Sequence, residues 1–148
     1  MTRIFLVLLI SAFVLSLTAC SVRYDFMIVN ETDAPLEIGL KWNDVLKVPL
    51  RTYSYLSFDG KKFEQLELIH TSDVGEKQEI RVVLEPKQAL SVHSIDEWPR
   101  EAIRRMVDSE YRIYQIDLKG SKGEIHLSGE QTWNQFREMD GGYFLIYR

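Results

Sequence analysis

The side chains of this 148-residue chain that could do chemistry are three histidines and scattered carboxylates and hydroxyls. His70, His93 and His126 all fall on segments with strand-like patterning, so sheet pairing could gather them around a metal ion. The alternative is three unrelated, half-exposed side chains, since no pair has His-x-His or His-x3-His spacing. We therefore predict neither a metal nor another cofactor.

Nucleophilic catalysis would need a serine or threonine on a sharp turn, beside a histidine base and a carboxylate. No Gly-x-Ser-x-Gly motif is present. Ser128, close to His126, comes nearest, but its spacing from Gln131 favours a helix cap instead. The sequence shows no catalytic constellation, so enzymatic activity is an open question that the pattern does not favour.

One cysteine, Cys20, follows an apolar run at the start of the chain. The run from Ile4 to Leu17 is uncharged, follows Arg3, and falls short of the roughly 18 to 20 residues that span a bilayer. This pattern predicts an export signal rather than a membrane span. With a single cysteine, the chain forms no internal disulfide even in an oxidising compartment.

The residues Leu17-Thr18-Ala19-Cys20 resemble the lipobox of bacterial lipoproteins, in which a small residue precedes the cysteine. The resemblance implies cleavage between Ala19 and Cys20, a thioether from the Cys20 thiol to diacylglycerol, and an acyl chain on the new amino terminus. Such a combination anchors durably, because a single acyl chain binds membranes only reversibly. In a Gram-negative source, Ser21 after the cysteine favours the outer membrane over the inner one.

The expected organisation is a cleaved signal peptide at 1–19, a lipidated N-terminus and short tether at 20–23, and one β-rich domain at 24–148. A chain of this size can bury one hydrophobic core. The net charge of −4 gives no electrostatic footprint for nucleic acid. Because three tether residues reach only on the order of 10 to 15 Å, we expect any partner to be membrane-proximal.

Strict alternation of apolar with polar or small residues over Leu36–Trp42 is typical of a half-buried strand. Turn formers at Asn30–Pro35 predict a hairpin or tight connection before it. The type of Arg51–Phe58 is left open, and a short strand could lie at Val45–Leu50. The other expected strands are Tyr24–Val29, Phe63–His70, Glu79–Glu85, Ala89–Ile95, Tyr111–Leu118, Gly123–Leu127 and Tyr143–Tyr147.

Two segments break the strand period. Apolar residues from Trp98 to Val107 recur at helical spacing, with Asp96 as a cap, and predict a short amphipathic helix. A second helical turn is expected at Gly129–Arg137, with Trp133 and Phe136 facing inward. Many short strands with few helices predict a mainly β protein: an antiparallel, immunoglobulin-like β-sandwich of about eight strands, with a partly closed β-barrel as the alternative.

Two groups of residues are candidates for an interaction surface. Tyr53, Tyr55 and Phe58 could form an exposed aromatic patch of the kind that anchors protein interfaces, with burial in the core as the alternative. The second group could rest on lipid headgroups, or could be an ordinary solvated helix face because acidic neighbours dilute its charge. It comprises Trp98, Arg100, Arg104 and Arg105.

These features favour a non-catalytic accessory or interaction protein of the cell envelope, lipid-anchored on the periplasmic side of the outer membrane. Its expected partners are membrane lipid, through Cys20, and a membrane-proximal envelope protein or glycan. One alternative is an envelope hydrolase or a glycan- or lipid-binding protein whose site only the fold assembles. The other is a periplasmic enzyme inhibitor. All three rest on analogy of fold and compartment.

Overall fold

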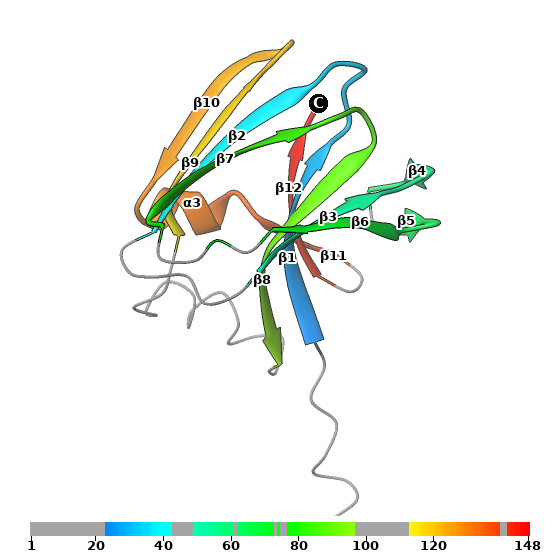
Figure 1. Ribbon diagram of the computed structural model, residues 1–148, viewed down its shortest axis with the longest axis horizontal. Coiled ribbons are helices and arrows are strands. Elements are labelled where there is room, and N and C mark those ends of the chain that lie inside the picture. The colour runs from blue at the N-terminus through cyan, green and yellow to red at the C-terminus, as the bar shows by residue number, and fades with distance from the viewer. Residues whose placement is uncertain are drawn as a thin grey trace, which may run out of the picture.

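Two β-sheets packed face to face make up the computed structural model, which describes residues 23–42, 49–60, 62–72, 74, 77–96, 113–139 and 142–148 (Figure 1). The lipobox and the amphipathic helix expected after Asp96 lie outside the described residues. One sheet has the order β11 (Arg137–Met139), β12 (Gly142–Tyr147), β1 (Arg23–Asn30), β8 (Gln88–Asp96), β3 (Leu50–Ser54) and β6 (Glu67–Ser72). The other has the order β10 (Gly123–Ser128), β9 (Ile113–Gly120), β2 (Leu36–Trp42) and β7 (Glu79–Leu84).

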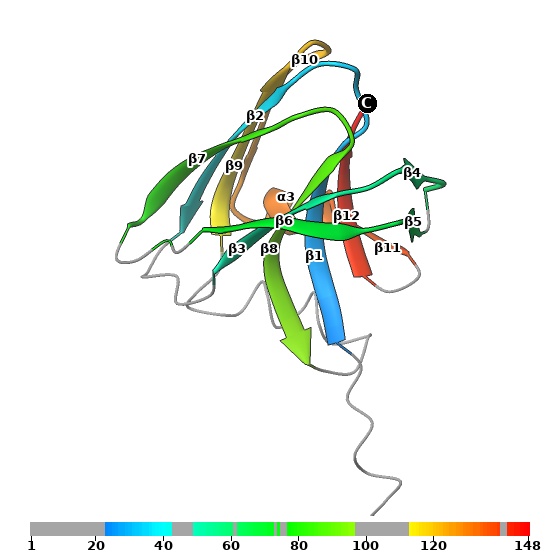
Figure 2. The ribbon, with the colours of Figure 1, turned by 45° about the vertical axis from the view of Figure 1, so that its right-hand side comes forward.

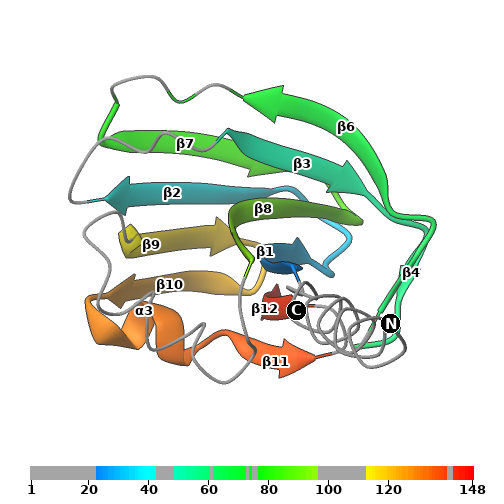
Figure 3. The same cartoon turned by 90° about the horizontal axis from the view of Figure 1, so that it is seen from below.

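Two smaller elements complete the described part. The hairpin of β4 (Ser57–Phe58) and β5 (Phe63–Glu64) extends from one corner, and the helix α3 (Glu130–Asn134) follows β10 (Figure 2). Seen from below, the six-stranded sheet lies in front of the four-stranded one (Figure 3). In the described ranges, no helix has the length and apolar character needed to cross a membrane.

Strand pairing is antiparallel throughout the described residues except between β1 and β12, which run parallel from Asp25↔Gly142 to Asn30↔Tyr147. A Cβ at Gly142 would lie 2.6 Å from the Asp25 carbonyl oxygen, so this close approach requires glycine. The predicted mainly β, antiparallel sandwich is confirmed, and the described strands form no closed barrel.

The strand predicted at Leu36–Trp42 is confirmed residue for residue as β2, with every second side chain buried. The single strand predicted at Phe63–His70 is wrong. Gln65 adopts a positive φ of 51°, which interrupts an extended strand and separates β5 from β6. The Asn30–Pro35 turn carries the chain from one sheet to the other, so of the two predicted forms it is the tight connection.

The helical turn predicted near Gly129 is confirmed as α3, but two details differ. Arg137 belongs to β11, and Ser128 ends β10 instead of capping the helix. The N-cap is Gly129, with no side-chain cap bond. Its φ of 59° and ψ of −135° suit glycine, and its N–H donates to the Tyr114 carbonyl at 2.7 Å.

The main core lies between the two sheets and centres on aromatic side chains. Trp133 and Phe136 point inward as predicted, with 0% and 4% exposure. Phe26 stacks on Tyr143 with ring centroids 4.7 Å apart and meets Trp133 edge-on at 5.4 Å. Burying each large apolar side chain contributes roughly 1.5 to 3 kcal/mol, so this cluster is a major source of stability.

A second apolar cluster covers the outer face of the six-stranded sheet. Met27, Val29, Ala89, Tyr55 and Phe144 are buried there. The β4–β5 hairpin lies over them through two stacked rings, Phe58 and Phe63, whose centroids are 4.5 Å apart. The six-stranded sheet is therefore apolar on both faces.

The fully buried Asn30 joins the two sheets through its side-chain amide. The nitrogen lies within hydrogen-bond distance of the carbonyl oxygens of Ala34, Leu84 and Glu85, at 2.9, 3.1 and 3.2 Å. The amide oxygen accepts from the backbone N–H and the hydroxyl of Thr32. One side chain thus satisfies backbone groups of both connections that cross between the sheets here, β1 to β2 and β7 to β8.

We predict that Asn30→Ala destabilises the protein by about 3 kcal/mol, because buried carbonyls left without a donor cost about 1 to 3 kcal/mol each. Asp33→Ala in the same turn is the matched control, since Asp33 is exposed and should change stability by less than about 0.5 kcal/mol. Urea denaturation of both variants measures the difference. Equal stabilities of the two variants would contradict the bridging role of Asn30.

Candidate functional site

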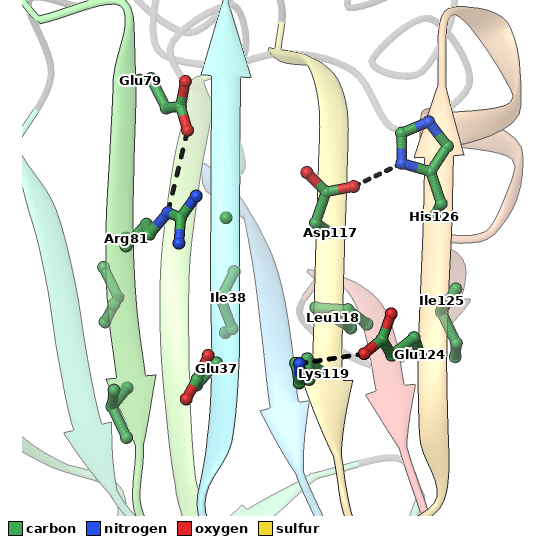
Figure 4. Close-up of a pocket in the computed structure, with 13 residues that line it drawn as sticks. Glu37, Ile38, Glu79, Arg81, Asp117, Leu118, Lys119, Glu124, Ile125 and His126 are labelled. Atoms are coloured by element: carbon green, nitrogen blue, oxygen red, sulfur yellow. Dashed lines mark hydrogen bonds and ion pairs between the residues drawn. The ribbon is translucent and has the colours of Figure 1, made fainter.

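A groove of about 460 Å³ lies on the outer face of the four-stranded sheet (Figure 4). Charged side chains from all four strands line it, while the strands turn Ile38 and Leu118 inward to the core. Gly39 contributes no side chain at its centre. The groove therefore has a low floor where the backbone is accessible, between walls that are mainly charged and also include the exposed residues Val83 and Ile125.

The strand register sets the groove residues in rows across the sheet. His126 on β10 is opposite Asp117 on β9, Asp117 is opposite Gly39 on β2, and Gly39 is opposite Arg81 on β7. Neighbouring strands are about 4.8 Å apart, so Asp117 and Arg81 face each other over a gap of roughly 10 Å. We call this line, His126–Asp117–Gly39–Arg81, the central row.

Asp117 is held in place by both of its carboxylate oxygens. The Gln115 side-chain nitrogen donates to Oδ2 at 2.6 Å, and the Nδ1 atom of His126 hydrogen-bonds to Oδ1 (Figure 4). Burial alone would raise the pKa of Asp117, but these two hydrogen bonds and the positive charges of His126 and Lys41 outweigh it and lower that pKa. The result is an oriented carboxylate that stays ionised.

Bonding of His126 through Nδ1 has a chemical consequence. A carboxylate on one ring nitrogen fixes the orientation of the imidazole and leaves the other nitrogen, Nε2, to contact a ligand. The His126 side chain is 64% exposed, so solvent or a ligand can reach it. His126 and Asp117 together form an acid–base pair at the edge of the groove.

Ion pairs connect charged side chains in the rows on either side of the central row. Lys119 lies 3.1 Å from Glu124, and the hydrogen bond and charge of Glu124, with the charge of Glu37, raise the pKa of Lys119. Glu79 lies 3.6 Å from Lys41 and 3.9 Å from Arg81. Because ion pairs exposed to solvent contribute little to stability, these charges remain free to rearrange around a ligand.

The groove contains an acid–base pair, but no nucleophilic side chain in the described residues is hydrogen-bonded to that pair. Ser128 lies two residues beyond His126 on the same strand, and in the described residues no hydrogen bond connects the two. The three histidines lie on separate strands: His70 on β6, His93 on β8 and His126 on β10. Within the described ranges, no three His, Cys, Asp or Glu side chains gather where a metal ion could bind.

The aromatic candidates from the sequence lie on the opposite side of the molecule, in the second apolar cluster. Tyr55 is 7% exposed, and its hydroxyl donates to the Asn30 carbonyl at 2.7 Å. Burial raises the pKa of this hydroxyl, and the charge of Glu31 adds to the increase. Tyr53 and Phe58 are half-buried against the same cluster. The second predicted group, Trp98, Arg100, Arg104 and Arg105, lies outside the described residues.

Sequence reasoning missed the groove because its residues come from four strands. Alternation over Leu36–Trp42 already places Glu37, Gly39 and Lys41 on the outward face of β2. The pairing of β2 with β7 and β9 brings Arg81 and Asp117 beside Gly39, and that pairing cannot be read from alternation.

Comparison with known proteins found no relative: no family model matches the chain, and no curated protein or solved structure matches it.

The lowered pKa of Asp117 predicts a pH-dependent contribution to stability. A carboxyl group whose pKa falls on folding stabilises the protein above its unfolded pKa, and this contribution disappears as the pH drops through the folded value. The stability difference between wild type and Asp117→Asn should therefore be larger above the ordinary value of 3.8 than below it, and should shrink as the pH falls below that value.

Urea denaturation from pH 6 to pH 2.5 measures this difference. Gln115→Ala keeps the carboxylate but removes one of its hydrogen bonds, so it should give a weaker dependence than wild type. A difference between wild type and the Asp117→Asn variant that grows on acidification would contradict the prediction.

Proposed function

We propose that this protein is a lipid-anchored, non-catalytic accessory protein of the cell envelope that binds its partner in the groove over Gly39. The observation that carries the binding role is the central row. It places an oriented carboxylate and imidazole on one side of an accessible backbone segment and a guanidinium on the other. Sites that bind polar ligands combine a few fixed polar groups with a concave surface in this way.

The charges favour a partner rich in hydrogen-bond donors. Four carboxylates line the groove, those of Glu37, Glu79, Asp117 and Glu124, against the cations of Arg81 and Lys119. A glycan presents hydroxyl donors, and an envelope protein presents amides and amines. Either fits the donors and acceptors along the central row, and the partner expected from the short tether is membrane-proximal.

The position of β1 supports the orientation this function needs. β1 begins at the bottom of the molecule, whereas the four-stranded sheet lies at the top left in both side views (Figure 1, Figure 2). Only Ser21 and Val22 separate the proposed lipidated Cys20 from β1. A membrane anchored there leaves the groove on the side facing away from the lipid.

The anchor is tested by comparing wild type with Cys20→Ala after expression in a Gram-negative host. We expect wild type to begin at an acylated Cys20 by intact mass and to fractionate with the outer membrane. The variant has no thiol to modify and should leave that fraction. Equal processing of both proteins, with both soluble in the periplasm, would contradict lipidation.

The groove is tested by in-cell photo-cross-linking from position 81. A photoreactive amino acid replacing Arg81 should give an adduct of defined mass, which Gly39→Leu in the same chain should abolish by filling the floor. A Cβ at Gly39 would meet the nearest atom, Asp117 Cβ, at 3.4 Å, so the backbone has room for a first side-chain atom, and circular dichroism shows whether the leucine variant is folded. Arg137 on β11, also an exposed arginine, is the matched control position. Adducts of equal yield at 81 and 137, or none at 81, would overturn the assignment.

The Asp117–His126 pair also favours a second candidate, an envelope hydrolase in which His126 activates water. Incubating the purified protein with peptidoglycan sacculi separates the two candidates. Binding alone gives co-sedimentation without fragments. Release of soluble fragments that His126→Gln abolishes would establish the hydrolase instead.

A further inference from the structure

The sheet edge beside β12 is only partly covered. β11 pairs with β12 from Gly142 to Phe144, and no described strand lies on that side of the remaining residues of β12. In a longer β11, Gln135 would lie opposite Ile146, but Gln135 is the C-cap of α3 instead. The edge therefore has a short gap directly in line with β11.

The backbone of Ile146 points its hydrogen-bonding groups into this gap. Within a strand, the N–H and C=O of one residue point to the same side, and the side alternates along the chain. The Tyr147 carbonyl accepts from the Glu31 N–H at 2.9 Å, so the groups of Tyr147 point toward β1. Those of Ile146 consequently point away from β1, and no backbone hydrogen bond of the described residues reaches them there.

A pocket of about 150 Å³ lies at this gap, where the edges of the two sheets meet. β10 contributes Ile125 and Leu127 to its lining, and β12 contributes Leu145 and Ile146. Leu127 and Leu145 also belong to the main core. The pocket therefore joins an apolar wall to an unpaired peptide group.

Two arginines line the same pocket, Arg137 at the start of β11 and Arg148 after the end of β12. Both are exposed, and neither forms an ion pair within the part of the chain that the structure describes. No carboxylate side chain is among the lining residues. The pocket is therefore complementary in charge to an anionic group.

We propose that this pocket binds the C-terminal end of a partner polypeptide. The terminal residue of the partner is opposite Ile146 in an antiparallel arrangement. Its N–H donates to the Ile146 carbonyl, and one oxygen of its carboxylate accepts from the Ile146 N–H. The carboxylate then faces Arg137. Strand addition at a sheet edge and capture of a terminal carboxylate are both established ways of recognising peptides.

The position of β11 is what selects a chain end. A partner antiparallel to β12 runs in the same direction as β11, and two residues beyond Ile146 its path is already occupied by Arg137. A continuous strand would therefore collide with β11, whereas a terminal carboxylate stops before it. A chain in the parallel orientation would bring its terminal ammonium against Arg137, where like charges repel. A carboxylate gains a charge-assisted hydrogen bond at the same place.

The same register predicts apolar residues at the end of the partner. The terminal side chain is on the face of Ile146, which packs against the second apolar cluster. The side chain before it is opposite Tyr147 and faces the space between the sheets, where Leu127 and Leu145 lie. We therefore expect two apolar residues to precede the free carboxylate.

This pocket and the groove over Gly39 are separate sites. Ile125 borders both, but no residue of the central row lines the pocket. β1 begins at the bottom of the molecule, whereas the chain end after β12 lies at the top, so the proposed anchor leaves the pocket accessible (Figure 1). A photoreactive residue at position 137 removes the cation that the pocket needs, so that position remains a suitable control for the groove.

Titration of the full chain in detergent with three short peptides tests the proposal. The first probe is acetyl-Gly-Gly-Val-Leu with a free carboxylate. The second is the same peptide with a C-terminal amide, and the third has an ester in place of its last peptide bond. The backbone N–H resonance of Ile146, followed by nuclear magnetic resonance, reports both the affinity and the place of binding.

We expect the free acid to shift the Ile146 resonance and to bind about tenfold more tightly than the amide probe, which has no charge for Arg137. The ester probe has no N–H for the Ile146 carbonyl and should bind about fivefold more weakly than the free acid.

Arg137→Gln should weaken binding of the free acid about tenfold and remove its advantage over the amide probe. Lys62→Gln is the matched control, because Lys62 is exposed between β4 and β5 and its substitution removes the same charge. It should leave both affinities unchanged. Circular dichroism shows whether each variant is folded.

Three results would overturn the proposal. The first is a free acid that binds no more tightly than the amide probe, or not at all. The second is binding that leaves the Ile146 resonance unshifted. The third is a shift of that resonance by decanoate but by none of the peptides, which would assign the pocket to an anionic amphiphile. None of these outcomes bears on the groove, so the proposed function stands or falls separately.

Discussion

The buried amide of Asn30 is the interaction on which the arrangement of the two sheets depends. β1 ends at this residue, and its side chain reaches the Leu84 and Glu85 carbonyls where β7 turns toward β8. Its backbone carbonyl accepts the Tyr55 hydroxyl, which joins the outer apolar cluster to the same point. A sandwich must carry polar backbone past an apolar core wherever the chain changes sheet, and each buried carbonyl there needs a donor. Asn30 supplies several of those bonds from one side chain.

Once the connections between the two sheets are fixed, the two-residue period of the strands determines which side chains face the core and which face solvent. Leu36, Ile38, Leu40 and Trp42 fill the core, so the residues between them must face solvent. The same alternation on the neighbouring strands turns polar residues outward beside Gly39. The groove is therefore a consequence of the strand register, and its central row needs no special loop. Sites built on paired strands are held more rigidly than sites on loops, which suits a surface that must present fixed donors and acceptors.

Local pattern was enough to predict most strands, the turn of helix at α3 and the inward rings of Trp133 and Phe136. Each of these depends on neighbours in sequence. The break at Gln65 was not predictable because a positive φ in a residue other than glycine is imposed by tertiary packing. The bridging role of Asn30 was hidden, since an asparagine in a turn has an ordinary local explanation. The groove was hidden for a different reason: Arg81, Gly39 and Asp117 meet only through long-range pairing.

The central claim is that a membrane-anchored sandwich holds its binding face away from the lipid. Energy transfer from a fluorophore at position 122, in the β9–β10 turn, to acceptors on vesicle headgroups tests this claim most directly, with a donor–acceptor pair whose Förster distance is shorter than the domain. A domain of this length has a radius of gyration of about 14 Å, so its far end lies roughly 30 to 40 Å from the near one. The account predicts weak transfer from the acylated protein on vesicles, in keeping with that separation. Near-complete transfer would place the four-stranded sheet against the membrane and contradict the account.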